Sequence, residues 1–208
     1  MKPVAQAENI VEAALRSLRP TQITVGYSEV LFKRQQWRAL DKDTRSQFFA
    51  DHMLPAVIGP KGKHCIIDHH HLGRALLEEG VITARLAVWA DLSALAKDEF
   101  WLVMDHRQWV HSYDARGRRE PFSAIPTGLK SLTDDPYRSL AAAVRMAGGF
   151  PKDQAPFAEF LWADFFRHRV PAAQLRSDPD SALSAALLLA HDTAAMHLPG
   201  WSGPGVTN

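Results

Sequence analysis

The chain has 208 residues, of which 46% are hydrophobic and 23% charged, so it is long and apolar enough to bury a sizeable core. A formal net charge of +1 excludes the overall basic surplus that is typical of strong non-specific nucleic-acid binders. The single cysteine, Cys65, excludes an internal disulfide framework and fits a reducing compartment.

The first eight residues lack the apolar core of a signal peptide. The longest apolar run, residues 182–190, is far shorter than the ~20 residues that a membrane-spanning helix needs. We therefore expect a cytoplasmic protein without a membrane partner.

Short strands and helices alternate in the first 95 residues. Apolar residues recur at helical spacing from Ile10 to Leu18, and Pro20 follows as a helix breaker. Pro60 and Gly62 mark a tight turn between two apolar runs. The expected elements are a helix over 8–18, a strand over 23–27, helices over 29–40 and 43–53 (the latter capped by Asp43 or Thr44), strands over 56–59 and 64–67, a helix from 69 to about 80, and a strand over 83–89.

The rest of the chain is mostly helical in pattern. Pro136 follows two aspartates, which favours a helix with proline in its first turn. Helices are expected over 98–110, 135–147, 157–168 and 179–197, with an exposed loop over 114–120 and irregular structure over 125–135. The pattern predicts an α+β protein with a core over 1–95 and a helical extension over 96–208 packed on it, or one continuous domain.

One junction concentrates chemically active side chains. A buried strand ends at Asp68, and a helix carrying three consecutive histidines, His69–His71, begins at once. The free N–H groups and the positive dipole end of such a helix attract anions. Asp68 is a good N-cap for this helix, and it is also suited to hold Mg²⁺ beside a phosphate.

The three histidines sweep about half of the helix circumference, because successive residues are about 100° apart. They therefore cannot all face one metal, and no zinc-site spacing supports them. His70 shares a helix face with Arg74. In the functional interpretation His70 and His71 contact an anion or move a proton. In the alternative, backbone carbonyls satisfy one or two of them.

Four other groups have two interpretations each. Glu29 is either a general base across the pocket or a favourable charge in a first helical turn. Lys61 and Lys63 either contact phosphate or are solvated turn residues. The basic pairs in 33–34 and 116–119 either touch a nucleic-acid backbone or lie on a solvated face. Residues 105–111 form either a second pocket wall or core. No signature of haem, flavin or NAD binding is present.

Two blocks of sequence carry a family resemblance. They are LRPTQITVGYSEV over 18–30, and PAVIG over 55–59 continuing into IDHHHL over 67–72. With DPYRSL over 135–140 and FAEFLWADFFR over 157–167, they resemble the ParB-like nuclease subgroup of the ParB/sulfiredoxin superfamily. The resemblance implies an N-terminal α/β domain with a small mixed sheet. It also implies a pocket for nucleotide phosphates where a strand meets a helix.

Members of that superfamily bind CTP and DNA, phosphorylate small substrates or repair oxidised cysteine, so the fold alone does not select an activity. In this chain His69 stands where a glycine is usual, and Leu72 stands where an arginine is expected, with Arg74 two residues on. Cys65 lies inside the strand, upstream of the turn, so sulfiredoxin chemistry is not expected.

The preferred hypothesis is a ParB-like protein that binds a nucleotide or other phosphorylated ligand and catalyses phosphodiester hydrolysis or phosphoryl transfer. The alternative is a non-catalytic, DNA-associated or regulatory binding module, although the net charge does not support DNA as a partner. The expected catalytic residues are His70, His71 and Glu29, and the expected ligand contacts are Asp68, His69, Arg74, Lys61 and Lys63, with Asp68 also the candidate ligand of Mg²⁺.

Overall fold

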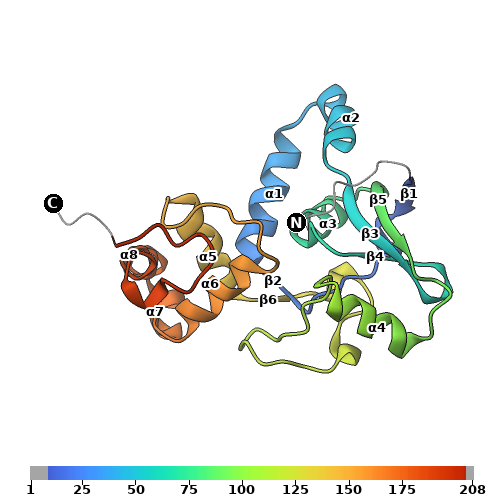
Figure 1. Ribbon diagram of the computed structural model, residues 1–208. Helices are drawn as coiled ribbons and strands as arrows, with labels where there is room; N and C mark the ends of the chain where they lie inside the picture. The colour runs from blue at the N-terminus through green and yellow to red at the C-terminus, as the bar shows by residue number, and fades with distance from the viewer. Residues whose placement is uncertain (1–8, 205–208) are drawn as a thin grey trace. The chain divides into compact units, whose positions relative to one another are not determined.

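The computed structural model describes residues 9–204, apart from the side chains of residues 46, 49 and 50 (Figure 1). Residues 1–8, where no signal peptide is predicted and where the first expected helix begins, lie outside this range. Contacts within the chain define two compact units, which meet in sequence between Asp134 and Asp135. No helix of the described range combines the length and apolarity needed to cross a membrane.

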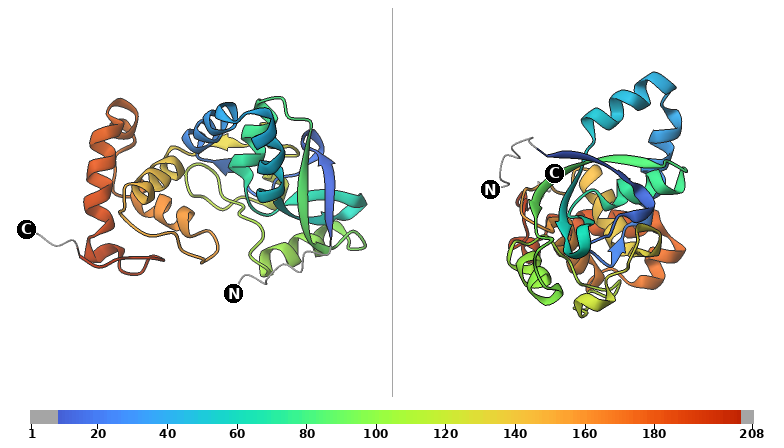
Figure 2. Two further views of the ribbon diagram at one scale, coloured as in Figure 1. Left: turned by 90° about the horizontal axis from the view of Figure 1, so that it is seen from above. Right: turned by 90° about the vertical axis from the view of Figure 1, so that its right-hand side faces the viewer.

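A four-stranded mixed sheet lies at the centre of the first unit, and its twist is visible in Figure 2. The strands β1(Ile10–Ala14), β5(Thr83–Asp91), β3(Leu54–Gly59) and β4(Lys63–Ile66) follow one another in this spatial order. β5 pairs with β3 in parallel, whereas the β1–β5 and β3–β4 pairs are antiparallel. The predicted α+β class with a small mixed sheet is therefore confirmed.

The helix predicted over 8–18 is wrong within the described residues. Ile10–Ala14 is the edge strand β1, which pairs with β5 from Ile10 opposite Ala87 to Ala14 opposite Thr83. A one-turn 3₁₀ helix over Leu15–Ser17 follows it. The apolar spacing suits a helix, but the segment begins with β-branched residues, and pairing with β5 outweighs local periodicity.

Three helices of the same unit lie close to their predicted ranges. They are α1(Tyr27–Ala39), α2(Lys42–Asp51) and α3(His70–Glu78). Asp41 is the N-cap of α2, since its carboxylate accepts the N–H of Thr44 at 2.8 Å, so the predicted cap at 43 or 44 is wrong. Just before α1, the short strand β2(Thr24–Val25) pairs in parallel with β6(Thr133–Asp134).

Helix α3 covers one face of the sheet, where its apolar residues meet Leu54, Ile66 and Leu86. Helix α4(Lys97–His106) packs with side chains of the opposite face, because Phe100 and Met104 cluster with Val57 and Cys65. The boundary between compact units thus lies after 134 rather than at the expected 95/96, since residues 96–134 complete the packing around the sheet. The remaining 3₁₀ turns of this unit are η2(Pro60–Gly62), η3(Phe122–Ala124) and η4(Leu129–Ser131).

The second unit is helical, as expected. Its elements are α5(Pro136–Met146), α6(Ala158–Arg167), α7(Ala172–Ser177), α8(Pro179–Ala190) and the 3₁₀ turn η5(Thr193–Ala195). Asp135 caps α5 and Pro136 opens it, as the sequence predicts. Trp162 and Phe166 are fully buried in its core. The short α7 was not predicted, and α8 ends at Ala190 rather than near 197.

Candidate functional site

The junction between β4 and α3 turns on a left-handed residue. His69 has φ 61° and ψ 28° and is the N-cap of α3, while Asp68 Oδ1 accepts the His69 N–H at 2.7 Å. The prediction that Asp68 is the N-cap is therefore wrong by one residue. The resemblance implies a glycine at this position, which suits a backbone with positive φ, and histidine is among the few other residues enriched there. Both Asp68 and His69 are exposed.

His70 is built into the fold. Only 3% of the residue is exposed, and its Nε2 accepts the backbone N–H of Thr21 at 3.1 Å. The Thr21 hydroxyl in turn donates to the carbonyl of Ile66, the last residue of β4, at 2.9 Å. Burial lowers the pKa of His70 to about 3, and the neighbouring His71 and His69 act in the same direction. His70 is therefore neutral at physiological pH and joins residue 21 to α3.

His71 instead meets the start of α1. Its Nε2 accepts the N–H of Gly26, the N-cap of α1, at 3.0 Å and lies 3.5 Å from Oε2 of Glu29. The two side chains are 13% and 18% exposed. The structure thus brings two of the predicted catalytic residues together. A carboxylate beside an imidazole is an arrangement that can accept and hold a proton.

Helices α1 and α3 run with their amino ends at the same edge. Gly26 contacts His71 at one end of the pair, while Arg34 and Arg38 contact Glu79 at the other. The positive ends of both helix dipoles therefore lie beside the Glu29–His71 pair. Two converging helix amino ends favour an anion more strongly than the single one that the sequence predicts.

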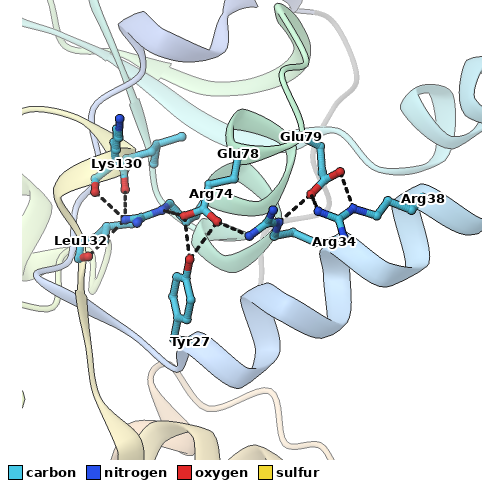
Figure 3. Close-up of polar contacts among 9 residues, drawn as sticks. Tyr27, Arg34, Arg38, Arg74, Glu78, Glu79, Lys130 and Leu132 are labelled. Atoms are coloured by element: carbon cyan, nitrogen blue, oxygen red, sulfur yellow. Dashed lines mark hydrogen bonds and ion pairs between the residues drawn. The ribbon is translucent and has the colours of Figure 1, made fainter.

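Arg74 lies in a charged network between α1 and α3 (Figure 3). Its guanidinium pairs with Glu78 and donates to the carbonyls of Leu129, Lys130 and Leu132 at 3.0, 2.6 and 3.2 Å. The side chain is 12% exposed. Arg74 was expected to neutralise a ligand, but here it holds the segment 129–132 against α3.

The carboxylates of this network are paired with α1. Tyr27 donates to Glu78 at 2.9 Å, and Arg34 contacts Glu78 and Glu79 at 2.8 and 2.6 Å (Figure 3). Hydrogen bonds from Arg38 and Arg34 lower the pKa of Glu79 to about 2. Acidic residues near the end of a helix oppose its dipole, so the arginines offset an unfavourable placement. Arg34 thus lies in an ion-pair network within the protein.

The predicted lysines are not part of this edge. Lys61 lies in the turn η2 with φ 62°, and Lys63 begins β4; both are exposed. The histidines follow the opposite end of β4. Since a strand rises about 3.3 Å per residue, the four-residue strand separates Lys63 from the junction by roughly 10 Å.

Two functional contacts were missed from the sequence. Thr21 is 1% exposed and donates its backbone N–H to His70, and Asp134 Oδ1 accepts the Tyr27 N–H at 2.8 Å. Thr21 lies inside the block that carries the family resemblance, and its place in that block was the available signal. No local signal pointed to Asp134, because its partner is 107 residues away in the sequence.

The other candidate groups lie outside this arrangement. His111 is 9% exposed and stacks on Tyr113 with ring centroids 4.7 Å apart, as core packing predicts. Asp105 pairs with Arg119 at 3.0 Å. A surface hollow of about 360 Å³, lined by residues 119–122, includes no residue of the junction. Within residues 9–204, no three His, Cys, Asp or Glu side chains gather as metal ligands would.

Comparisons with known proteins found one matching family and similar solved structures. A family model described as "Putative ParB-like nuclease" matches residues 11–168. The crystal structure of protein Atu1540 from Agrobacterium tumefaciens is similar at 46% identity and a TM-score of 0.88, over 95% of this chain and 100% of that one. The chromosome-partitioning protein ParB from Caulobacter crescentus, complexed with CTP-gamma-S, aligns at 14% identity and a TM-score of 0.33, over 89% and 93% of the two chains.

No curated protein matches the sequence. The family match, however, covers both the sheet-containing unit and the beginning of the helical unit, including every residue of the Glu29–His71 edge. The chain belongs to the ParB-like nuclease family.

Proposed function

We propose that this protein binds a nucleotide or another phosphorylated ligand at the edge where α1 and α3 begin. The observation that carries the proposal is the meeting of two helix amino ends at Glu29 and His71, with Oε2 and Nε2 3.5 Å apart. Helix amino ends favour phosphate, and a carboxylate–imidazole pair supplies proton transfer. The exposed Asp68 and His69 flank this edge and are the proposed ligand contacts.

The proposed chemistry is phosphodiester hydrolysis or phosphoryl transfer. Glu29 takes the proton from the attacking water or hydroxyl, whose oxygen forms the new bond to phosphorus while the bond to the leaving oxygen breaks. His71 lies beside Glu29 and accepts the Gly26 N–H, which fixes the start of α1, the helix that carries Glu29. Asp68 would supply one carboxylate oxygen to Mg²⁺, and ligand phosphates would supply others, which is a common mode of magnesium binding. The ion would neutralise charge on the phosphoryl group.

Roles within this proposal differ from residue to residue. His70 supports the site through Thr21 and takes no proton, because its imidazole is enclosed and its pKa is about 3. Lys61 and Lys63 are left out, since they lie at the other end of β4. A cytoplasmic location remains a prediction from cysteine usage.

Thermal unfolding with CTP, ATP and ADP, each with and without Mg²⁺, tests the proposal. A ligand at 100 times its Kd adds about 2.7 kcal/mol of stability, which raises the Tm of a chain of this size by roughly 5–10 °C. Glu29→Gln should abolish turnover of a bis-nitrophenyl phosphodiester or of the bound nucleotide. The matched control is Glu12→Gln, which alters an exposed glutamate on β1.

Absence of stabilisation by every nucleotide at millimolar concentration would refute the proposal. Stabilisation without turnover, unaffected by Glu29→Gln, would favour the alternative of a regulatory binding module. DNA binding that weakens steeply with salt in a gel shift would extend that alternative to a DNA-associated protein.

A further inference from the structure

The Nε2 atom of His71 has two neighbours of opposite character. The Gly26 N–H is a donor at 3.0 Å, and Glu29 Oε2 is an acceptor at 3.5 Å. A neutral imidazole carries one proton, so Nε2 either accepts from Gly26 or donates to Glu29. The partner of one ring nitrogen sets which nitrogen is protonated. The position of the first turn of α1 therefore sets which of these two contacts Nε2 can make.

That first turn is held by a closed circuit of contacts, which we call the Tyr27 clamp; its members are Tyr27, Arg74, Glu78 and residues 129–134. Arg74 holds the carbonyls of Leu129, Lys130 and Leu132, and the chain continues from there into β6. Asp134 of β6 accepts the Tyr27 N–H at 2.8 Å.

The circuit closes through the tyrosine side chain. Tyr27 donates from its hydroxyl to Glu78 at 2.9 Å, and Glu78 pairs with Arg74 (Figure 3). The Arg74 guanidinium also lies 5.7 Å from the centre of the Tyr27 ring. Both the backbone and the side chain of residue 27 are thus held, and the Gly26 N–H is one peptide away.

We infer that the Tyr27 clamp fixes neutral His71 as the Nδ1–H tautomer by holding the Gly26 N–H against Nε2, with Arg74 as the positioning residue on which the clamp depends. A clamped α1 keeps the donor at 3.0 Å, which is normal hydrogen-bond distance, and leaves Glu29 at 3.5 Å. When the clamp is loosened, Gly26 withdraws and the Nε2–H tautomer, donating to Glu29, becomes populated. In the Nε2–H tautomer, Glu29 accepts a hydrogen bond from His71. The relevance of this contact to catalysis rests on the proposed function, in which Glu29 takes the proton from the attacking water or hydroxyl.

Nitrogen-15 NMR of the histidine side chains in the ligand-free, full-length protein tests the inference. Spectra are recorded about two pH units above the ordinary histidine pKa, where neutral tautomers are distinguished by which ring nitrogen carries the proton. His71 signals are assigned by their loss in His71→Gln. The wild type should show Nδ1–H. Arg74→Lys keeps the charge but cannot reach Glu78 and three carbonyls together, so a second His71 species with Nε2–H is expected.

The matched control is Arg38→Ala. Arg38 belongs to the same network but contacts Glu79, on the side away from residues 129–134, so the His71 signals should stay as in the wild type. Asp134→Ala, which breaks the link to the Tyr27 N–H directly, should reproduce the effect of Arg74→Lys. If Arg74→Lys does not fold, the His71 signals of Asp134→Ala test the inference instead.

The inference is overturned by an Nε2–H tautomer in the wild type. It is equally overturned by wild-type His71 signals in a folded Arg74→Lys or Asp134→Ala protein, or by the same change in Arg38→Ala. Because no ligand enters this experiment, its result is separable from that of the nucleotide-binding test. Failure of nucleotides to bind would remove the proposed function and leave the tautomer result standing.

Discussion

Replacing His70 by alanine should destabilise the sheet-containing unit strongly. The residue is 3% exposed, and its removal leaves the Thr21 N–H buried without its acceptor. An orphaned buried donor costs about 1–3 kcal/mol, and deletion of a large buried side chain costs about 2–5 kcal/mol. Because the imidazole is partly polar, we expect a combined loss of about 3–5 kcal/mol, a large share of the stability of an ordinary domain.

The same substitution should change the pH dependence of stability. Burial lowers the pKa of His70 to about 3 in the folded protein, from the ordinary histidine value of 6.5 that applies to the unfolded chain. The unfolded chain therefore binds a proton that the folded chain excludes. Proton uptake by the unfolded chain therefore disfavours folding below pH 6.5, so stability is full above pH 6.5 and falls toward pH 3 by about 1.4 kcal/mol for each pH unit. His70→Ala lacks this contribution, so its deficit should shrink by about 2 kcal/mol between about pH 7 and pH 5.

Urea unfolding followed by tryptophan fluorescence provides the assay, since Trp37, Trp89, Trp101 and Trp109 all lie in the sheet-containing unit. His70→Gln, which keeps an acceptor on a side chain of similar reach, should recover part of the loss. The exposed His106 offers a control, and His106→Ala should change stability by less than about 1 kcal/mol. A deficit of His70→Ala below about 1 kcal/mol at pH 7, or one that does not depend on pH, would refute the reasoning.

Three further substitutions test other parts of the structure by urea unfolding. His69→Val places a β-branched residue at φ 61° and should cost about 1–2 kcal/mol, whereas His69→Gly should not; equal losses would contradict the role of backbone conformation. Asp135→Ala removes the cap of α5 and one carboxylate partner of Arg167, 2.8 Å from its guanidinium, while Asp164 stays at 3.1 Å; a loss of about 2–4 kcal/mol from the helical unit is expected, and a loss below about 1 kcal/mol would argue against it. Gly59→Ala sets a Cβ 3.1 Å from the Phe100 ring and should cost about 1–3 kcal/mol; an unchanged stability would contradict the tight packing of α4 at this point.

Local chemistry was sufficient to predict much of this protein. Pro60 and Gly62 predicted the turn between β3 and β4, and Asp135 with Pro136 predicted the start of α5. Such signals lie within a few residues of the element they define, so they act whatever the rest of the chain does. The sequence also predicted the junction at Asp68, and one of the two interpretations of Glu29 placed it across the pocket from the histidines.

Long-range partners decided what periodicity could not. Ile10–Ala14 is a strand because it pairs with β5, which lies roughly 70 residues later in the sequence. Three adjacent histidines are equivalent as sequence, yet His69 is exposed, His70 is enclosed and His71 faces Glu29. The difference follows from the ~100° step of the helix and from the segments at Thr21 and Gly26 that meet each ring. Composition and local pattern thus determined which chemistry was available, and only tertiary packing decided which imidazole was desolvated and which met a carboxylate, because burial and charge neighbours are properties of the folded environment.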